Sequence, residues 1–153
     1  MREIKFRGKD INGEWVYGHY VVLEESTSLA TPCIWQYGAR RATPVKPETV
    51  GQYTGIKDSN GIEVYEGDIL RVTIPEEHEP IYDYTGWITD YDIKDGSIQL
   101  GAVSFKHGMF EYDELRVLEG SSEGMYNIPL CIVENTEVVG NIHDELESTK
   151  EEL

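Results

Sequence analysis

The sequence predicts an all-β, mainly antiparallel fold, and three observations point to this class. Apolar and polar residues alternate over short stretches, which is the period of a half-buried strand. Turn signatures rich in Asp, Asn and Gly separate these stretches. No segment shows a sustained 3.6-residue apolar period, so long amphipathic helices are not expected. The strand spacing favours a small SH3-like barrel or a β-roll with hairpin extensions.

The first element is a β-hairpin at the start of the chain. Alternation over residues 3–7 predicts a strand that turns Ile4 and Phe6 toward a core. The sequence DING follows as a turn in which Gly13 can adopt a positive φ, and residues 14–23 return as the second strand. The outer face of the first strand then carries a short basic stripe, formed by Lys5, Arg7 and Lys9.

The same turn signature occurs again in KDSNGIEVY, residues 57–65. It matches KDINGEWVY at residues 9–17, with Lys, Asp, Asn, Gly, Val and Tyr in register. Either a β unit has been duplicated within the chain, or a favourable hairpin turn has been used twice. The second explanation is favoured.

The remaining elements continue this pattern of short strands. Residues 32–37 and 42–46 are weaker strand candidates, and residues 75–80 form an acidic loop bounded by prolines, which should be exposed and mobile. Residues 143–153 can form a short helix or a tail. Further strands are expected at residues 62–65, 69–74, 81–91, 97–105, 109–112, 116–118, 128–133 and 137–142.

Length and composition indicate one folded domain. Hydrophobic residues make up 39% and aromatic residues 10% of the 153 positions, which is too apolar for a disordered chain. We expect a single β domain over residues 1–146, or alternatively a hairpin subdomain at 1–50 and an SH3-like barrel at 51–146. Residues 147–153 would form an acidic tail. With no apolar run suited to a signal peptide or a membrane span, we expect a cytoplasmic protein.

The net charge of −16 is unevenly distributed along the chain. Residues 1–57 contain eight Lys and Arg and six Asp and Glu. The residues beyond Lys57 contain five Lys and Arg and 23 Asp and Glu. Such a field repels phosphate backbones, so the acidic part disfavours nonspecific nucleic-acid binding.

Motifs for catalysis or metal binding are weak. Residues 120–124, GSSEG, fit the G-x-S-x-G pattern, but a hydrolase elbow needs a long helix after it, and Pro129 follows closely. Cys33 and Cys131 lie far apart in apolar surroundings, which favours buried, reduced thiols. The four histidines share no ligand spacing, and no nucleotide-binding signature is present. The sequence therefore predicts no catalytic residue, cofactor or metal, and no enzyme.

Aromatic and basic side chains are the remaining candidates for a functional surface. Two pairs of large rings alternate along strands, Trp15 with Tyr17 and Trp35 with Tyr37. If these faces point inward the rings belong to the core, which is favoured, and if outward they are anchors for a protein partner or another subunit. A site for an acidic partner, including the acidic half of a neighbouring copy in a head-to-tail assembly, could be formed by Lys5, Arg7, Lys9, Arg40 and Arg41.

Three segments carry a family resemblance: IKFRGKD at residues 4–10, TGIKDSNGIEVYEGDIL at 54–70 and VVGNIHDEL at 138–146. Together they resemble the YopX family of small proteins from phages and prophages of Gram-positive bacteria. The family's C-terminal motif usually continues with Asn-Pro, which this chain lacks. The resemblance implies a phage accessory protein in the host cytoplasm, and it transfers no catalytic residue because the family has no assigned activity.

The leading hypothesis is therefore a noncatalytic β-rich accessory protein that binds protein and forms a homo-oligomer. The alternative is engagement of nucleic acid, either by direct binding through the basic stripe or by mimicry through the acidic part. An enzyme ranks third.

Overall fold

The computed structural model describes residues 1–24, 30–122 and 124–144. Within these ranges the chain forms two open antiparallel sheets, a separate two-stranded ribbon and a short helical turn at residues 142–144. The predicted all-β, mainly antiparallel class with a short C-terminal helix is confirmed. The strands of the described ranges form no closed barrel, so the SH3-like closure that the spacing favoured is not observed.

The first sheet has six strands in the order β4-β3-β2-β1-β5-β6, and each is antiparallel to its neighbours. The 3-10 helix η1 (Pro47–Thr49) leads into β5. The core of the first sheet is a small buried cluster of Val16, Ile34 and Val45. The strands are β1 (Phe6–Lys9), β2 (Trp15–Leu23), β3 (Thr31–Trp35), β4 (Thr43–Pro44), β5 (Gly51–Lys57) and β6 (Glu63–Tyr65).

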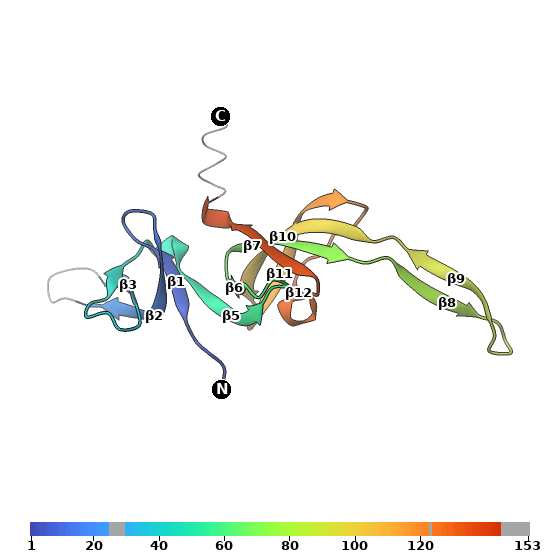
Figure 1. Cartoon of the computed structure of the whole chain (residues 1–153), viewed down its shortest axis with the longest axis horizontal. Helices are drawn as coiled ribbons and strands as arrows, with labels where there is room; N and C mark the ends of the chain where they lie inside the picture. Colours follow the sequence, from blue (N-terminus) through green and yellow to red (C-terminus); the bar gives the residue numbers. More distant parts are fainter. Residues whose placement is uncertain (25–29, 123, 145–153) are drawn as a thin grey trace, which may run out of the picture.

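The second sheet has five strands in the order β12-β11-β10-β7-β13 and lies beside the first along the long axis of the molecule (Figure 1). Its core includes Val64 of β6, so the two sheets share this cluster. The other fully buried members are Leu70, Val72, Val103, Tyr112 and Leu130. The strands are β7 (Asp68–Ile74), β10 (Ser97–Lys106), β11 (Met109–Glu119), β12 (Ile128–Pro129) and β13 (Thr136–Asn141), with the 3-10 helix η2 (Leu130–Ile132) before β13.

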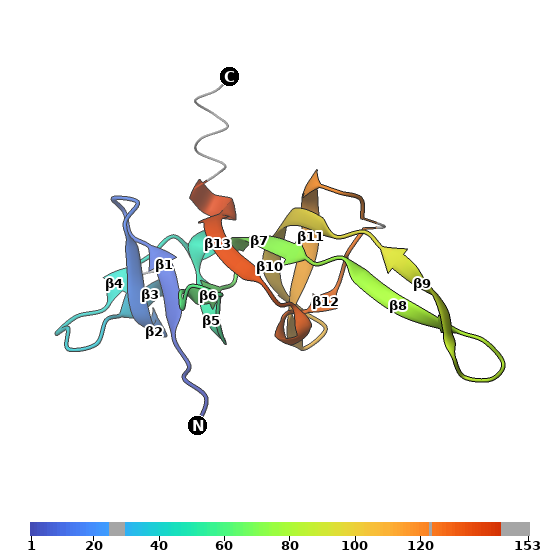
Figure 2. The same cartoon turned by 45° about the vertical axis from the view of Figure 1, so that its right-hand side comes forward.

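The third unit is a ribbon of β8 (Glu77–Tyr82) and β9 (Ile88–Lys94), which we call the arm, residues 77–94. It is inserted between β7 and β10 of the second sheet. Figures 1 and 2 show the arm extending away from both sheets, with its turn at the far end. Every residue of its two strands is exposed. The arm is therefore the part of the described chain that is least supported by a core.

Three hairpins use one turn geometry. In each, the Oδ1 atom of an Asp accepts hydrogen bonds from the backbone N–H groups two and four residues later, at 2.8–3.1 Å. A Gly three residues after the Asp has a φ of 80° to 88°, which only glycine adopts without strain. The turns begin at Asp10, Asp58 and Asp83. Because the third turn, DYTGW, lacks the surrounding KDxNGxxVY pattern, it supports reuse of a favourable turn over duplication.

Several boundaries differ from the sequence predictions. The first strand begins at Phe6, and Ile4 is 53% exposed because β5 pairs with β1 only at Phe6 and Arg7. The predicted acidic loop at 75–80 is wrong from Glu77 onward, since that stretch is β8, paired with β9. The single strand predicted at 81–91 is likewise wrong, because the Asp83 turn divides it.

The C-terminal part also differs in detail. The strand predicted at 128–133 ends at Pro129 and continues as η2, which leaves Cys131 exposed, contrary to the buried thiol expected; Cys33 is buried as predicted. In the GNIHD motif, Asn141 Oδ1 accepts hydrogen bonds from the backbone N–H groups of His143 and Asp144, at 3.0 and 2.9 Å. This is an N-cap, so the motif starts the helical turn without the Asn-Pro of the family pattern. The predicted tail, residues 147–153, lies outside the described residues.

Candidate functional site

The predicted basic stripe does not lie on the surface. Arg7 and Lys9 are only 6% and 3% exposed. Their strand β1 faces the acidic second half of the same chain, whose carboxylates pair with these cations. The expected exposure of this part of the stripe is therefore wrong, because the attraction that the sequence assigned to an acidic partner is satisfied within one molecule.

Arg7 lies at the junction of the two sheets. One guanidinium nitrogen donates to Asp68 Oδ1 at 2.7 Å and to the carbonyl oxygen of Glu66 at 3.3 Å. The guanidinium carbon lies 4.5 Å and 4.9 Å from the ring centres of Trp15 and Tyr65, within cation–π range. Burial raises the pKa of Asp68, against the opposing effects of Arg7 and of the Tyr65 N–H. These four side chains, Arg7, Trp15, Tyr65 and Asp68, are the junction cluster.

The flanking lysines are paired as well. Lys5 donates to Glu63 Oε1 at 2.7 Å, also contacts Glu3, and lies over the ring of Tyr53. The hydrogen bond to Glu63 is the main cause that raises the pKa of Lys5. Lys9 pairs with Asp144 of the C-terminal helical turn. The stripe thus ties the start of the chain to β6, to β7 and to the helical turn at residues 142–144.

The other predicted site residues lie on the first sheet in different environments. Trp15 is half-buried in the junction, and Tyr17 is 48% exposed with its ring 5.6 Å from Tyr65. Trp35 is 40% exposed, and its indole N–H donates to the carbonyl of Ala39 at 2.9 Å. The loop after β3 carries Tyr37, which is fully exposed, and Arg40 and Arg41, which are exposed. Of the predicted site residues on this sheet, Arg7 and Trp15 are therefore in contact, while the exposed loop residues lie apart from them.

The arm presents the largest concentration of exposed aromatic and aliphatic side chains on the described chain. Directly opposed residues of an antiparallel pair share one face of the ribbon. One face pairs His78 with Ile93, Pro80 with Tyr91, and Tyr82 with Ile88. Ile93, Tyr91, Tyr82 and Ile88 on this apolar face are each about half exposed.

The opposite face of the arm is acidic. It pairs Glu77 with Lys94, Glu79 with Asp92, and Ile81 with Asp90. Lys94 donates to Glu79 Oε1 at 2.9 Å on the exposed surface. At the tip, the turn leaves Tyr84 fully exposed and Trp87 75% exposed. The arm is thus an amphipathic ribbon whose apolar face nothing in the described chain covers.

An isolated two-stranded hairpin is at best marginally stable in water, because one ribbon cannot bury its own apolar face.

Sequence reasoning missed the arm, since it placed Asp83–Trp87 inside one long strand. The signal was nonetheless present: Asp83 and Gly86 stand at the same spacing as Asp and Gly in the two recognised turns. Thr in place of Asn at the third position concealed it.

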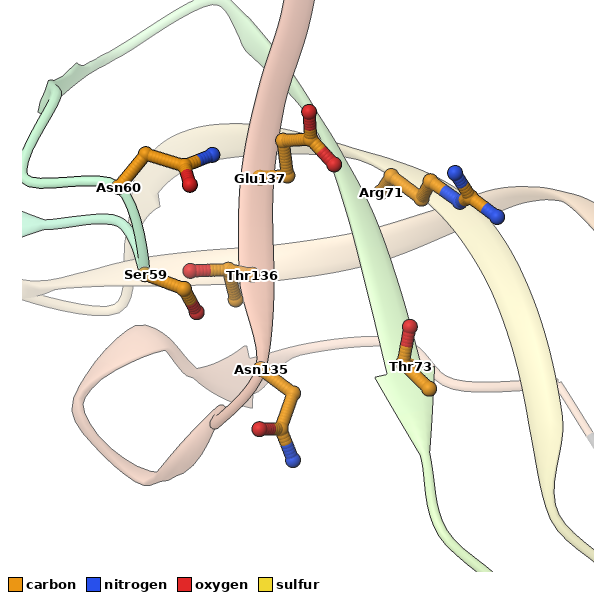
Figure 3. Close-up of a pocket in the computed structure, with 7 residues that line it drawn as sticks. All are labelled: Ser59, Asn60, Arg71, Thr73, Asn135, Thr136 and Glu137. Carbon is orange, nitrogen blue, oxygen red and sulfur yellow. The ribbon is translucent and has the colours of Figure 1, made fainter.

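A polar pocket of about 410 Å³ lies between the Asp58 turn and strands β7 and β13. Figure 3 shows that Ser59 and Asn60 come from the turn and Arg71 and Thr73 from β7. Thr136 and Glu137 are the first residues of β13, and Asn135 directly precedes it. Ser59 donates its backbone N–H to the carbonyl of Thr136 at 2.9 Å. The buried polar atoms that lack partners in the described ranges all lie elsewhere, so this pocket points to no particular ligand.

Other kinds of site are not seen in the ranges that the structure covers. No three or more His, Cys, Asp or Glu side chains there are grouped to hold a metal ion. No helix in those ranges reaches the length and apolarity that crossing a bilayer requires.

The fold and the exposed ribbon define a class, namely small antiparallel β proteins that carry an uncovered amphipathic arm. The YopX protein family model matches residues 5–147, and the chain belongs to the YopX family. Among solved structures, protein EF1440 from Enterococcus faecalis is similar, with 20% identity over 97% of this chain and 99% of that one. Its TM-score of 0.48 is too low to transfer function. A comparison with curated proteins found no match.

Proposed function

We propose that the protein is a noncatalytic protein-binding module, and that the arm is its principal binding element. The observation that carries this proposal is the uncovered apolar face of the arm, with Tyr82, Ile88, Tyr91 and Ile93 on one side of the ribbon. Exposed patches of this kind mark interaction sites in soluble proteins. Aromatic side chains dominate the binding energy of protein interfaces, and the arm offers four Tyr and Trp residues.

The cellular setting is also part of the proposal. A phage or prophage accessory protein acting in the host cytoplasm fits the YopX membership and the acidic composition. Self-association is part of the proposal, because the same arm is available to a further copy of the chain.

A noncatalytic role is supported by the surroundings of the pair formed by His107 and Glu111. Glu111 is buried, and His107 Nδ1 lies 2.9 Å from its Oε1 atom. The hydroxyl of Ser104, which is paired with Glu111 on the neighbouring strand, has no hydrogen-bond partner among the described residues and so is not held against a base there. None of these side chains lines the polar pocket of Figure 3.

Nucleic-acid engagement remains the rival function. Its direct form is weakened because Arg7 and Lys9 are engaged by Asp68 and Asp144. Mimicry of nucleic acid has one supporting observation, the acidic face of the arm, which carries Glu77, Glu79, Asp90 and Asp92. The two functions therefore assign binding to opposite faces of one ribbon.

Face-specific variants test the proposal. In the first variant Tyr82, Tyr91 and Ile93 are replaced by Thr, which keeps the β propensity of the strands while removing the apolar face. The matched control carries Glu77→Gln, Glu79→Gln and Asp92→Asn on the opposite face. Each tagged protein is used to capture partners from host lysate at low and high salt, with nuclease treatment.

We expect a salt-resistant, nuclease-resistant protein to be captured by the wild type and the acidic-face control, and to be lost with the Thr variant. An apolar contact resists salt, whereas charge-based contacts weaken steeply as salt rises. Capture that survives the Thr variant but is lost with the acidic-face variant and at high salt would overturn the proposal in favour of mimicry.

A further inference from the structure

An apolar groove lies where the β10–β11 hairpin of the second sheet meets η2. Phe105, Met109 and Phe110 line it from the β10–β11 hairpin, and Leu130 and Ile132 from η2. Its volume of about 520 Å³ is in the range of sites that hold ligand-sized groups. Phe105 and Ile132 are 52% and 65% exposed, so the groove is open to solvent.

The charge at this groove is unusual for an acidic protein. Among the described residues that line it, Arg2 is the one that carries a charge, and none is a carboxylate. The pocket beside the junction cluster, by contrast, is lined by Glu63, Asp68 and Asp144 as well as Arg7. An acidic, apolar group would therefore meet less repulsion at this groove than at the junction.

The arm is a group of that chemistry. Over residues 77–94 it carries five Asp and Glu against one Lys, and its tip exposes Tyr84 and Trp87. Tyr, Trp and Arg are the residues most often found at interface hot spots. The arm and the groove are thus complementary in both apolar character and charge.

Ile132 of the groove also lines a pocket beside Pro75 and Glu77 at the base of the arm, but the tip of the arm cannot reach the groove of the same molecule. Strand β10 runs from Ser97, next to the base of the arm, to Phe105 and Lys106 at the groove. Eight residues of extended chain between Ser97 and Phe105 span roughly 26 Å. Figures 1 and 2 show the arm pointing away from that end of the sheet. Contact between the tip and the groove requires two molecules.

We propose that the tip of the arm, with Trp87 and Tyr84, inserts into the groove at Phe105, Met109 and Ile132 of a second copy of the chain. This inference rests on the proposed role of the arm and specifies that the arm binds the groove of a second copy of the chain. Reciprocal exchange of two arms would close a dimer, and one-way insertion would build a larger assembly. Both arrangements use the same contact.

Two variants test the two sides of the contact separately, one in the arm and one in the groove. Trp87→Ser removes the anchor and leaves the groove intact, whereas Ile132→Glu places a carboxylate in the groove and leaves the tip of the arm unchanged. Both side chains are largely exposed, so the fold should be preserved. Ile62→Glu, at a residue that is 53% exposed and does not line the groove, is the matched control.

Light scattering over a concentration series measures association. The wild type and Ile62→Glu should associate, and each of the other two variants should bind itself at least about tenfold more weakly. An equimolar mixture of Trp87→Ser and Ile132→Glu should regain one contact and form a mixed pair, because each supplies the half that the other lacks. A monomeric wild type, or a mixture that stays monomeric, would overturn the inference.

Cys131 gives a second readout, because it lines the groove and is exposed, whereas Cys33 is buried. Alkylation of Cys131 should slow as the wild type associates and should be unchanged by concentration in Trp87→Ser. Equal alkylation rates at all concentrations of an associated wild type would place the contact elsewhere. If the arm captures a host protein while the wild type stays monomeric, this inference and the self-association part of the proposed function fail, and the protein-binding role of the arm stands.

Discussion

The Arg7 guanidinium and the Asp68 carboxylate form a buried ion pair, with nitrogen and oxygen 2.7 Å apart, that connects β1 of the first sheet to β7 of the second. Both side chains are at least nine-tenths buried. The pair is enclosed by Trp15 and Tyr65, which shield it from water. The contact between the basic start of the chain and its acidic second part therefore has a structural role, because it joins the two sheets.

Removing one partner of this pair should be strongly destabilising. Asp68→Ala leaves the Arg7 guanidinium buried without its counter-ion, which typically costs about 3–5 kcal/mol. Urea unfolding followed by tryptophan fluorescence measures the change. The double variant Arg7→Met, Asp68→Ala removes both charges and should recover part of the loss. Equal destabilisation by the single and the double variant would contradict a buried pair.

Asp58 should stabilise the fold in a pH-dependent way. Desolvation raises its pKa, but hydrogen bonds from the N–H groups of Val138, Ile62 and Asn60 outweigh it and lower the pKa. Since the folded pKa lies below the unfolded value of about 3.9, this stabilisation is present above that pH and is lost as the pH falls. Asp58→Asn should flatten the decrease of unfolding free energy between about pH 5 and pH 2.

The matched control for Asp58 is Asp10, at the equivalent position of the repeated turn. Asp10 accepts the same two backbone bonds from its own turn, whereas Asp58 also accepts one from Val138 of β13 at 2.9 Å. Asp58→Asn should cost at least about 1.5 kcal/mol, and Asp10→Asn less. A larger effect at Asp10 would show that the link to β13 contributes little.

Gly101 should tolerate no side chain. A Cβ atom there would lie 2.2 Å from the ring of Tyr112, which is fully buried in the core, and 2.7 Å from the carbonyl of Asp113. Gly101→Ala should therefore lower the melting temperature by many degrees or prevent folding. Gly140→Ala, in β13, meets nothing within 4 Å and is the control, with an expected change of a few degrees at most.

The arm should open independently of the two sheets. Gly86 has a φ of 88°, so Gly86→Ala strains the turn at the tip and loosens the ribbon. Amide hydrogen exchange should quicken at β8 and β9 while the amides of β7 and β10 keep their protection. Faster exchange throughout the second sheet would instead show that the arm and the sheet unfold as one unit.

Local signals in the sequence were sufficient for the class of fold and for the first hairpins. The alternation of residues around Val16 and the turns at Asp10 and Asp58 depend on neighbours within a few positions, so they could be recognised without knowledge of the partner strands. The arm was missed for a local reason as well, since its turn contains Thr85 where the others contain Asn. The lack of barrel closure has a different origin, because it depends on how distant strands pair.

The sequence by itself determined that this is an antiparallel β protein of the YopX family with an acidic second part, because strand period, turn chemistry and charge are properties of short segments. Only the tertiary structure decided the positions of the charged and aromatic side chains. Arg7 and Asp68 are 61 residues apart, and their burial follows from the packing of two sheets. Exposure likewise depends on what the rest of the chain covers, which is why Trp15 is half-buried at the junction while Trp87 remains exposed.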